Sequence, residues 1–145
     1  MIFAIVAVLA AGLFTGAAVY VTLVEHPARL ECGPAVALTE FGPSYRRGTV
    51  MQASLAVIGG LAGVAAWLSG DGRGWLIGGL LLVSVVPYTL LAILPTNREL
   101  LSAASGTDAP RGMHLLRRWG RLHTLRWVLS GAAFLLFVTL LARPR

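Results

Sequence analysis

The stretch Ile2–Val24 reads IFAIVAVLAAGLFTGAAVYVTLV and contains 23 residues without one charged side chain. About 20 apolar residues in a helix are enough to cross the ~30 Å hydrocarbon core of a bilayer. A secretory signal would instead have a basic segment in front of a shorter apolar core of roughly 7–15 residues. This stretch therefore predicts a membrane-spanning helix that is retained in the protein.

Three further stretches continue the pattern along the chain. Gly48–Gly70 and Gly74–Asn97 are also free of charge and long enough to span alone. The last charge-free run, Trp127–Ala142, has 16 residues and would cover only about 24 Å. The fourth helix must therefore begin near residue 122, which brings His123 and Arg126 to the membrane edge. The predicted spans are about 2–24, 48–70, 74–96 and 122–142.

The composition agrees with one membrane domain over residues 1–145. Apolar residues make up 57% of the chain and charged residues 12%, and the mean hydropathy is +0.77; soluble domains carry roughly 25% charged residues. The net charge of +6 comes from arginines that lie between apolar runs, so we expect no nucleic-acid partner. The single cysteine, Cys32, cannot form an intramolecular disulfide.

The connections between the spans predict the topology. Asp71, Gly72 and Arg73 lie between two glycines and indicate a tight turn, which makes the second and third spans antiparallel neighbours. The other two connections, about 25–47 and 98–121, are longer, and we expect them to be loops on the opposite side. The fold class is therefore all-α, an up-down-up-down four-helix bundle in the membrane with both termini on one side.

Arginine is unevenly distributed between the two sides of this bundle. Eight arginines fall on the side of the long connections and three on the other side. By the positive-inside rule, the long connections face the cytoplasm of what we expect to be the cell membrane. The first group is Arg29, Arg46, Arg47, Arg98, Arg111, Arg117, Arg118 and Arg121, and the second is Arg73, Arg143 and Arg145.

Glycine and proline positions bear on how the helices pack. Glycines recur at four-residue spacing, which would let helix backbones approach closely, within the chain or in a homo-oligomer. Pro87 should kink the third span because proline lacks a backbone N–H. The glycine pairs are Gly12 and Gly16, Gly59 and Gly63, and Gly74 and Gly78.

The predicted topology brings most of the unusual polar residues to one membrane face, where the long connections lie. Two histidines from different helices could act there as general base and proton shuttle, and arginines could stabilise an anion. Trp119, His123 and Arg126 are spaced i, i+4 and i+7 and share one helical stripe. The candidate catalytic residues are His26, His123, Arg126 and Arg29. The candidate substrate-binding residues are Glu25, Tyr45, Arg46, Gln52, Asn97 and Trp119.

Most of these residues also have a structural interpretation, and His26 and His123 could be interfacial histidines without a chemical role. Arg29 and Arg126 could reach lipid head groups, and Glu25 could pair with Arg29 one turn away. Asn97 could cap the end of a helix. The tryptophans and tyrosines could belong to an interfacial belt of aromatic side chains.

The sequence leaves the cofactor open between none, a transition metal and a haem. Glu25, His26 and His123 are ligand types that suit iron or copper, and the two histidines could hold a haem. The chain has no HExxH, CxxC, glycine-rich phosphate loop or Ser/His/Asp arrangement. Hydrolase, kinase and dinucleotide-binding functions therefore have no support.

Nearly the whole chain resembles the small four-span, anthrone oxygenase-like membrane proteins. The resemblance rests on three segments in order, Val24-Glu25-His26-Pro27-Ala28-Arg29, Pro95-Thr96-Asn97-Arg98-Glu99-Leu100-Leu101 and Trp119-Gly120-Arg121-Leu122-His123-Thr124-Leu125-Arg126. It implies oxidation of an anthrone, or a similar small aromatic such as a hydroquinone, by O2. His26 or His123 would remove a proton, and Arg29 and Arg126 would stabilise the anion. A lipophilic substrate would enter sideways from the bilayer.

Two functions of other classes remain as alternatives. The arginine-rich mouth could hold the head group of a lipid or quinone in a binding or transport module. The glycine faces could instead serve a membrane assembly partner that has no small-molecule site. A head-group binder needs the arginines but not the histidines, so His26 and His123 distinguish it from the enzyme.

Overall fold

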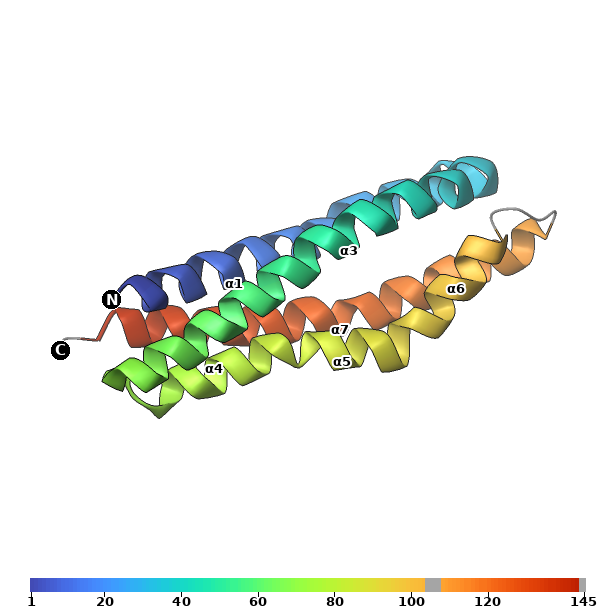
Figure 1. The fold of residues 1–145 in the computed structure, drawn as a ribbon. Helices are drawn as coiled ribbons and strands as arrows, with labels where there is room; N and C mark the ends of the chain where they lie inside the picture. Colours follow the sequence, from blue (N-terminus) through green and yellow to red (C-terminus); the bar gives the residue numbers. More distant parts are fainter. Residues whose placement is uncertain (104–107, 144–145) are drawn as a thin grey trace.

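The computed structural model of the chain describes residues 1–103 and 108–143. Within these residues, four long helical stretches run antiparallel, and the start of the first stretch lies at the same end of the bundle as the end of the fourth (Figure 1). The predicted all-α, up-down-up-down bundle is therefore confirmed. In chain order the elements are α1 (Ile2–Tyr20), η1 (Val21–Glu25), α2 (His26–Glu31), α3 (Gly33–Ala66), η2 (Trp67–Asp71), α4 (Arg73–Val83), α5 (Val85–Tyr88), η3 (Thr89–Ile93), α6 (Leu94–Ala103) and α7 (Ala109–Leu141).

The outer surface of the bundle is that of a membrane protein. Each of the four helical stretches contains an apolar segment that is long enough to cross a bilayer. Large aliphatic side chains point outward, and Leu13, Leu61 and Leu91 are 63%, 64% and 80% exposed. Apolar surface of this extent suits lipid rather than water. The chain is therefore a multi-pass integral membrane protein.

The helices extend well beyond the predicted spans. The connections expected to be loops at 25–47 and 98–121 are largely helical, since α3 begins at Gly33 and α7 at Ala109. Asp108 caps α7, because its side chain accepts a hydrogen bond from the Arg111 backbone N–H at 3.1 Å. The expectation of loops was wrong because hydropathy reports contact with lipid and not helix formation. Arg145, which was counted in the arginine asymmetry, lies outside the described residues.

Glycines with positive φ form the turns between neighbouring helices. Gly70 and Gly72 have φ of 90° and 100°, a region that glycine adopts without steric cost. They confirm the predicted tight turn between the second and third helical stretches. Gly33, with φ of 79°, follows Cys32 at the turn between the first two stretches.

Glycines also bring α3 and α4 into close contact. A Cβ added at Gly60 would lie 2.1 Å from Val83 Cγ2, and one added at Gly79 would lie 2.8 Å from the Gly60 carbonyl oxygen. In the predicted glycine pairs, an added Cβ would come within 3.1 Å of an atom of another helix at five positions among the described residues. These are Gly12, Gly59, Gly63, Gly74 and Gly78. These glycines therefore serve packing inside the bundle, and a homo-oligomer stays a prediction.

Prolines interrupt the regular helices near the site end. α4 ends at Val83 and α5 begins at Val85, because Pro87 lacks the N–H that would bond to the Val83 carbonyl. The π-helical turns η1 and η3 are each followed two residues later by a proline, Pro27 and Pro95. The ribbon changes direction between α5 and α6 (Figure 1). Such turns change the direction in which the following side chains point.

The described residues form two separate apolar clusters in the interior. One lies toward the termini and includes Phe14 and Phe137. The other lies toward the opposite end and includes Leu100 and Leu116. The elements α1, η1 and α2 form one continuous helical stretch, Ile2–Glu31, which we call the first helix. Polar side chains of the first helix, α3 and α7 occur between these clusters, and a cavity opens there.

Candidate functional site

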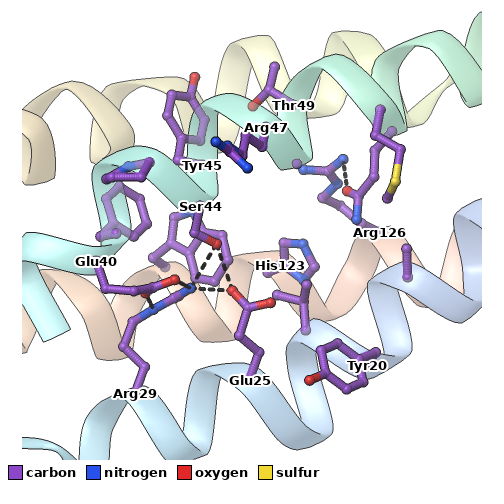
Figure 2. Close-up of a pocket in the computed structure, with 18 of the residues that line it drawn as sticks. Tyr20, Glu25, Arg29, Glu40, Ser44, Tyr45, Arg47, Thr49, His123 and Arg126 are labelled. Carbon is purple, nitrogen blue, oxygen red and sulfur yellow. Dashed lines mark hydrogen bonds and ion pairs between the residues drawn. The ribbon is translucent and has the colours of Figure 1, made fainter.

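A cavity of about 770 Å³ lies between the first helix, α3 and α7, and Figure 2 shows the charged and aromatic side chains around it. Tyr20 and Met51 belong to its wall and are 56% and 48% exposed, so the cavity reaches the outer surface between α1 and α3. Gly16 also belongs to the wall, and an added Cβ there would meet nothing within 4 Å. The predicted site residues that line the cavity are Glu25, Arg29, Tyr45, Gln52, Trp119, His123 and Arg126.

Arg126 is held beside the cavity by the side chain of Gln52. Its Nη2 donates a hydrogen bond to Gln52 Oε1 at 2.6 Å, and its guanidinium lies 5.5 Å from the centroid of the Phe14 ring. Its Nε is buried without a hydrogen-bond partner. Within the described part of the chain, no carboxylate lies within 4.0 Å of its nitrogens. An ionised side chain in a membrane span usually faces a partner or a functional cavity, because leaving it unpaired is costly.

His123 lies one turn before Arg126 on α7 and lines the same cavity, although it is only 2% exposed. Its Nδ1 lies 3.1 Å from Thr22 Oγ1 on η1. Its ring stacks on Trp119, with 4.7 Å between the centroids and 28° between the planes. These contacts fix the imidazole and leave Nε2 as the nitrogen that is not engaged with Thr22.

His26 has different surroundings and does not line the cavity. Its ring lies 5.2 Å from that of Trp119, measured between centroids, and it is 6% exposed. A Cβ added at Gly120 would lie 2.4 Å from His26 Nε2, so this nitrogen faces the backbone of α7. The structure therefore brings both predicted histidines to one tryptophan, but only His123 to the cavity.

Arg29 is 6% exposed. It lies in a network with two carboxylates (Figure 2). Its guanidinium forms ion pairs with Glu25 and Glu40. Ser44 joins the network, since its Oγ accepts from Arg29 Nη2 at 3.1 Å and donates to Glu25 Oε1 at 2.7 Å. The pairing of Glu25 with Arg29 at i+4 agrees with the structural interpretation of these residues. Two carboxylates outnumber one guanidinium, so Arg29 adds no net positive charge to the cavity.

The other predicted residues divide between the cavity wall and the surroundings. Tyr45 lines the cavity and stacks on Phe41, with 5.8 Å between the centroids and 4° between the planes. Arg46 is exposed and does not line the cavity. Asn97 is 1% exposed, its Oδ1 has no hydrogen-bond partner, and it also lies outside the cavity wall.

Sequence reasoning missed three residues that organise the site. Glu40 and Ser44 lie in the segment that was expected to be a loop. A helical interpretation of that segment would have placed both on one face, because they are four residues apart. Thr22 carried no signal, since a threonine in an apolar helix commonly bonds to the carbonyl one turn earlier.

The donor set does not fit the metal or haem site that the sequence left open. Among residues 1–103 and 108–143, no group of three or more His, Cys, Asp or Glu side chains is placed to hold a metal ion. A haem between His26 and His123 would have to displace Trp119, whose ring contacts both imidazoles.

Comparisons with known proteins agree on one family. A family model described as anthrone oxygenase matches residues 41–136. A curated relative described as an anthrone oxygenase, from Claviceps purpurea (strain 20.1), is 30% identical, and the match covers 92% of this chain and 86% of that protein. No solved structure matches at a significant level. The segment matched by the family model contains Gln52, Trp119, His123 and Arg126, whereas Thr22 precedes it.

Proposed function

Because this chain belongs to the anthrone oxygenase family, we propose that it oxidises an anthrone-like aromatic with O2 in the cavity between the first helix, α3 and α7. The observation that carries the proposal is Arg126, a guanidinium that lines the cavity with no carboxylate partner in the described chain. A substrate anion would supply the missing negative charge. The cavity volume of about 770 Å³ lies within the ~300–1,000 Å³ that is usual for small-molecule sites.

The reaction needs a base and a group that stabilises an anion. The methylene carbon of an anthrone is acidic because removing its proton gives an aromatic phenolate. We assign proton removal to His123 and stabilisation of the phenolate oxygen to Arg126. These two residues are three apart on α7 and project from one face, with roughly 5–6 Å between their Cβ atoms. A flat substrate beside them would present its methylene to one residue and its oxygen to the other.

The oxidation then proceeds from the phenolate without an external reductant. The electron-rich anion passes one electron to O2, and the resulting radical and superoxide combine into a peroxide anion at the former methylene carbon, which becomes a hydroperoxide when it takes the proton held by His123. Loss of the remaining proton on that carbon and cleavage of the O–O bond give a carbonyl group and water. One oxygen atom enters the product, and His123 returns the proton that it removed. Arg126 also stabilises the negative charge of the superoxide.

The cavity wall suits a flat, lipophilic substrate. Phe41, Tyr45 and Trp119 supply aromatic surface, and stacked or edge-on contacts with such rings stabilise an aromatic ligand. The exposed positions of Tyr20 and Met51 support entry from the lipid between α1 and α3.

In this proposal His26 and Arg29 support the site instead of taking part in the chemistry. Arg29 is neutralised by Glu25 and Glu40, and its guanidinium lies 5.9 Å from the Trp119 ring. His26 also contacts Trp119 and is buried against α7. The proposal differs here from the sequence-based assignment, in which both residues were catalytic.

The same features weigh against a lipid or quinone head-group binder. That alternative depends on an arginine-rich mouth, but Arg29 is neutralised and Arg46 does not line the cavity, so that Arg47 and Arg126 are the arginines of the wall without a carboxylate partner in the described chain. It also gives no role to the contact between His123 and Thr22.

We further propose that the protein lies in the cell membrane with the cavity toward its cytoplasmic side. The exposed arginines of α3, α6 and α7 support this orientation through the positive-inside rule. The side that carries the termini has Arg73 and Arg143 among the described residues.

The proposal is tested by following O2 uptake and anthraquinone formation with purified protein in detergent. His123→Gln and Arg126→Lys should each reduce turnover by roughly 100- to 1,000-fold, since lysine cannot reproduce the planar contacts of arginine. Arg121→Lys, at an exposed position on the same helix, is the matched control and should remain active. Wild-type turnover in well-folded His123→Gln and Arg126→Lys proteins would refute the proposed roles.

A further inference from the structure

The hydroxyl group of Thr22 makes two short contacts. Its Oγ1 lies 2.9 Å from the carbonyl oxygen of Ala18, one turn earlier, and 3.1 Å from Nδ1 of His123 on α7. Both distances are those of hydrogen bonds. The second contact therefore links the first helix directly to the proposed base.

Counting hydrogens assigns a direction to each of these bonds. A hydroxyl group has one hydrogen to donate, although its oxygen can accept others. If that hydrogen pointed to His123, the oxygens of Thr22 and Ala18 would face each other at 2.9 Å with no hydrogen between them, which is repulsive. The hydroxyl hydrogen therefore points to Ala18, and the contact with His123 is a donation from Nδ1–H to Thr22 Oγ1.

We propose that Thr22 is a positioning residue that selects the Nδ1–H tautomer of neutral His123. A neutral imidazole carries one N–H, so Nε2 then keeps its lone pair and can accept a proton from the substrate. In free neutral histidine the Nε2–H tautomer is the more common one, and it would leave the base without a lone pair on that nitrogen. The catalytic consequence rests on the proposed function, whereas the tautomer itself does not.

The fold holds the imidazole ring of His123 at its edge, through Thr22, and at its face, through Trp119. Thr22 is the second residue of the π-helical turn η1, and such a turn shifts the following side chains around the helix axis relative to a regular helix. Trp119 stacks on the ring of His123 with 4.7 Å between centroids. Thr22 therefore fixes one nitrogen while Trp119 fixes the plane.

The tautomer can be measured without any substrate. Histidine labelled with ¹⁵N in the ring gives spectra that report which nitrogen carries the hydrogen, and His123→Gln identifies the signals of His123 among the three histidines. We expect the hydrogen on Nδ1 in the wild type and in Thr22→Ser, which keeps the hydroxyl. Thr22→Val has the same shape without the hydroxyl and should move the hydrogen to Nε2.

Thr89→Val is the matched control for this change. Thr89 begins the π-helical turn η3, its Oγ1 donates to the Val85 carbonyl oxygen at 2.7 Å, and it does not line the cavity. The control should therefore leave the His123 spectrum unchanged. In anthrone turnover, Thr22→Val should lower kcat by about 100-fold with little change in KM, and Thr22→Ser should keep most of the activity.

The outcomes separate this inference from the proposed function. A hydrogen on Nε2 of His123 in the folded wild type, or a tautomer that Thr22→Val leaves unchanged, would overturn the inference. If the tautomer shifts as expected but the wild type oxidises no anthrone, the tautomer assignment stands and the proposed function fails.

Discussion

Gln52 offers a test of whether Arg126 acts as a cation toward substrate or only anchors its helix. Gln52 is 4% exposed, and its Oε1 accepts a hydrogen bond from Arg126 Nη2 at 2.6 Å. Gln52→Glu keeps the shape of the side chain and places a carboxylate beside the guanidinium. Arg126 is only partly buried in the wild type and no carboxylate of the described residues pairs with it, so the new carboxylate meets a partly desolvated cation that lacks a charged partner.

The structure predicts opposite effects on stability and activity. The existing hydrogen bond involves a charged group and contributes about 1.5–3 kcal/mol, so an ion pair in its place should keep the protein at least as stable. A neutralised guanidinium no longer stabilises a substrate anion, and losing such a group costs roughly 100- to 1,000-fold in rate, or ~2.7–4 kcal/mol. Gln52→Glu should therefore be stable and nearly inactive.

The assay compares anthrone turnover and the melting temperature of wild type, Gln52→Glu and Gln52→Met in one detergent. Methionine has a similar length and no charge, so Gln52→Met loses the hydrogen bond but keeps the cationic charge of Arg126. We expect Gln52→Met to be less stable than Gln52→Glu and more active. Equal activity of Gln52→Glu and wild type would refute the role of Arg126 as a cation toward substrate.

Three further predictions concern packing, the cavity and orientation. Gly60→Ala should destabilise the protein by about 1–3 kcal/mol, because its Cβ would lie 2.1 Å from a side chain of α4; Gly48→Ala, with nothing within 4 Å, should not lower the melting temperature. Gly16→Leu should fill part of the cavity and lower kcat/KM at an unchanged melting temperature, and an unaffected kcat/KM would place the substrate elsewhere. On intact cells, the exposed Cys32 should be protected from an impermeant maleimide, while Ser69→Cys in a Cys32→Ser background should react. The reverse labelling pattern would invert the orientation.

The sequence was sufficient to predict the bundle and to predict that part of the candidate site lies together. The lengths of the charge-free runs determine the number of spans. The turn at Gly70 and Gly72 can be predicted from the neighbouring residues alone, because glycine adopts positive φ readily. Connectivity then determines which helix ends meet, so Gln52, His123 and Arg126 could be expected to lie close together.

The remaining features depend on where each helix stops and how it is rotated, and hydropathy does not encode either. The helical part of residues 25–47 was missed, so the carboxylate of Glu40 that neutralises Arg29 was not anticipated. The placement of His26 behind Trp119, and of Asn97 outside the cavity wall, depends on helix rotation near the π-helical turns.

The central claim is that the chain uses O2 to oxidise the methylene group of an anthrone. The most direct measurement supplies ¹⁸O₂ to purified protein with an anthrone in detergent and determines the isotope content of the product by mass spectrometry. Heat-denatured protein provides the baseline, since anthrones also oxidise slowly in air. The account predicts one ¹⁸O atom in each anthraquinone, one O2 consumed per product, and a rate above baseline that is lost in His123→Gln. No turnover above the denatured control across a panel of anthrones and hydroquinones would contradict it.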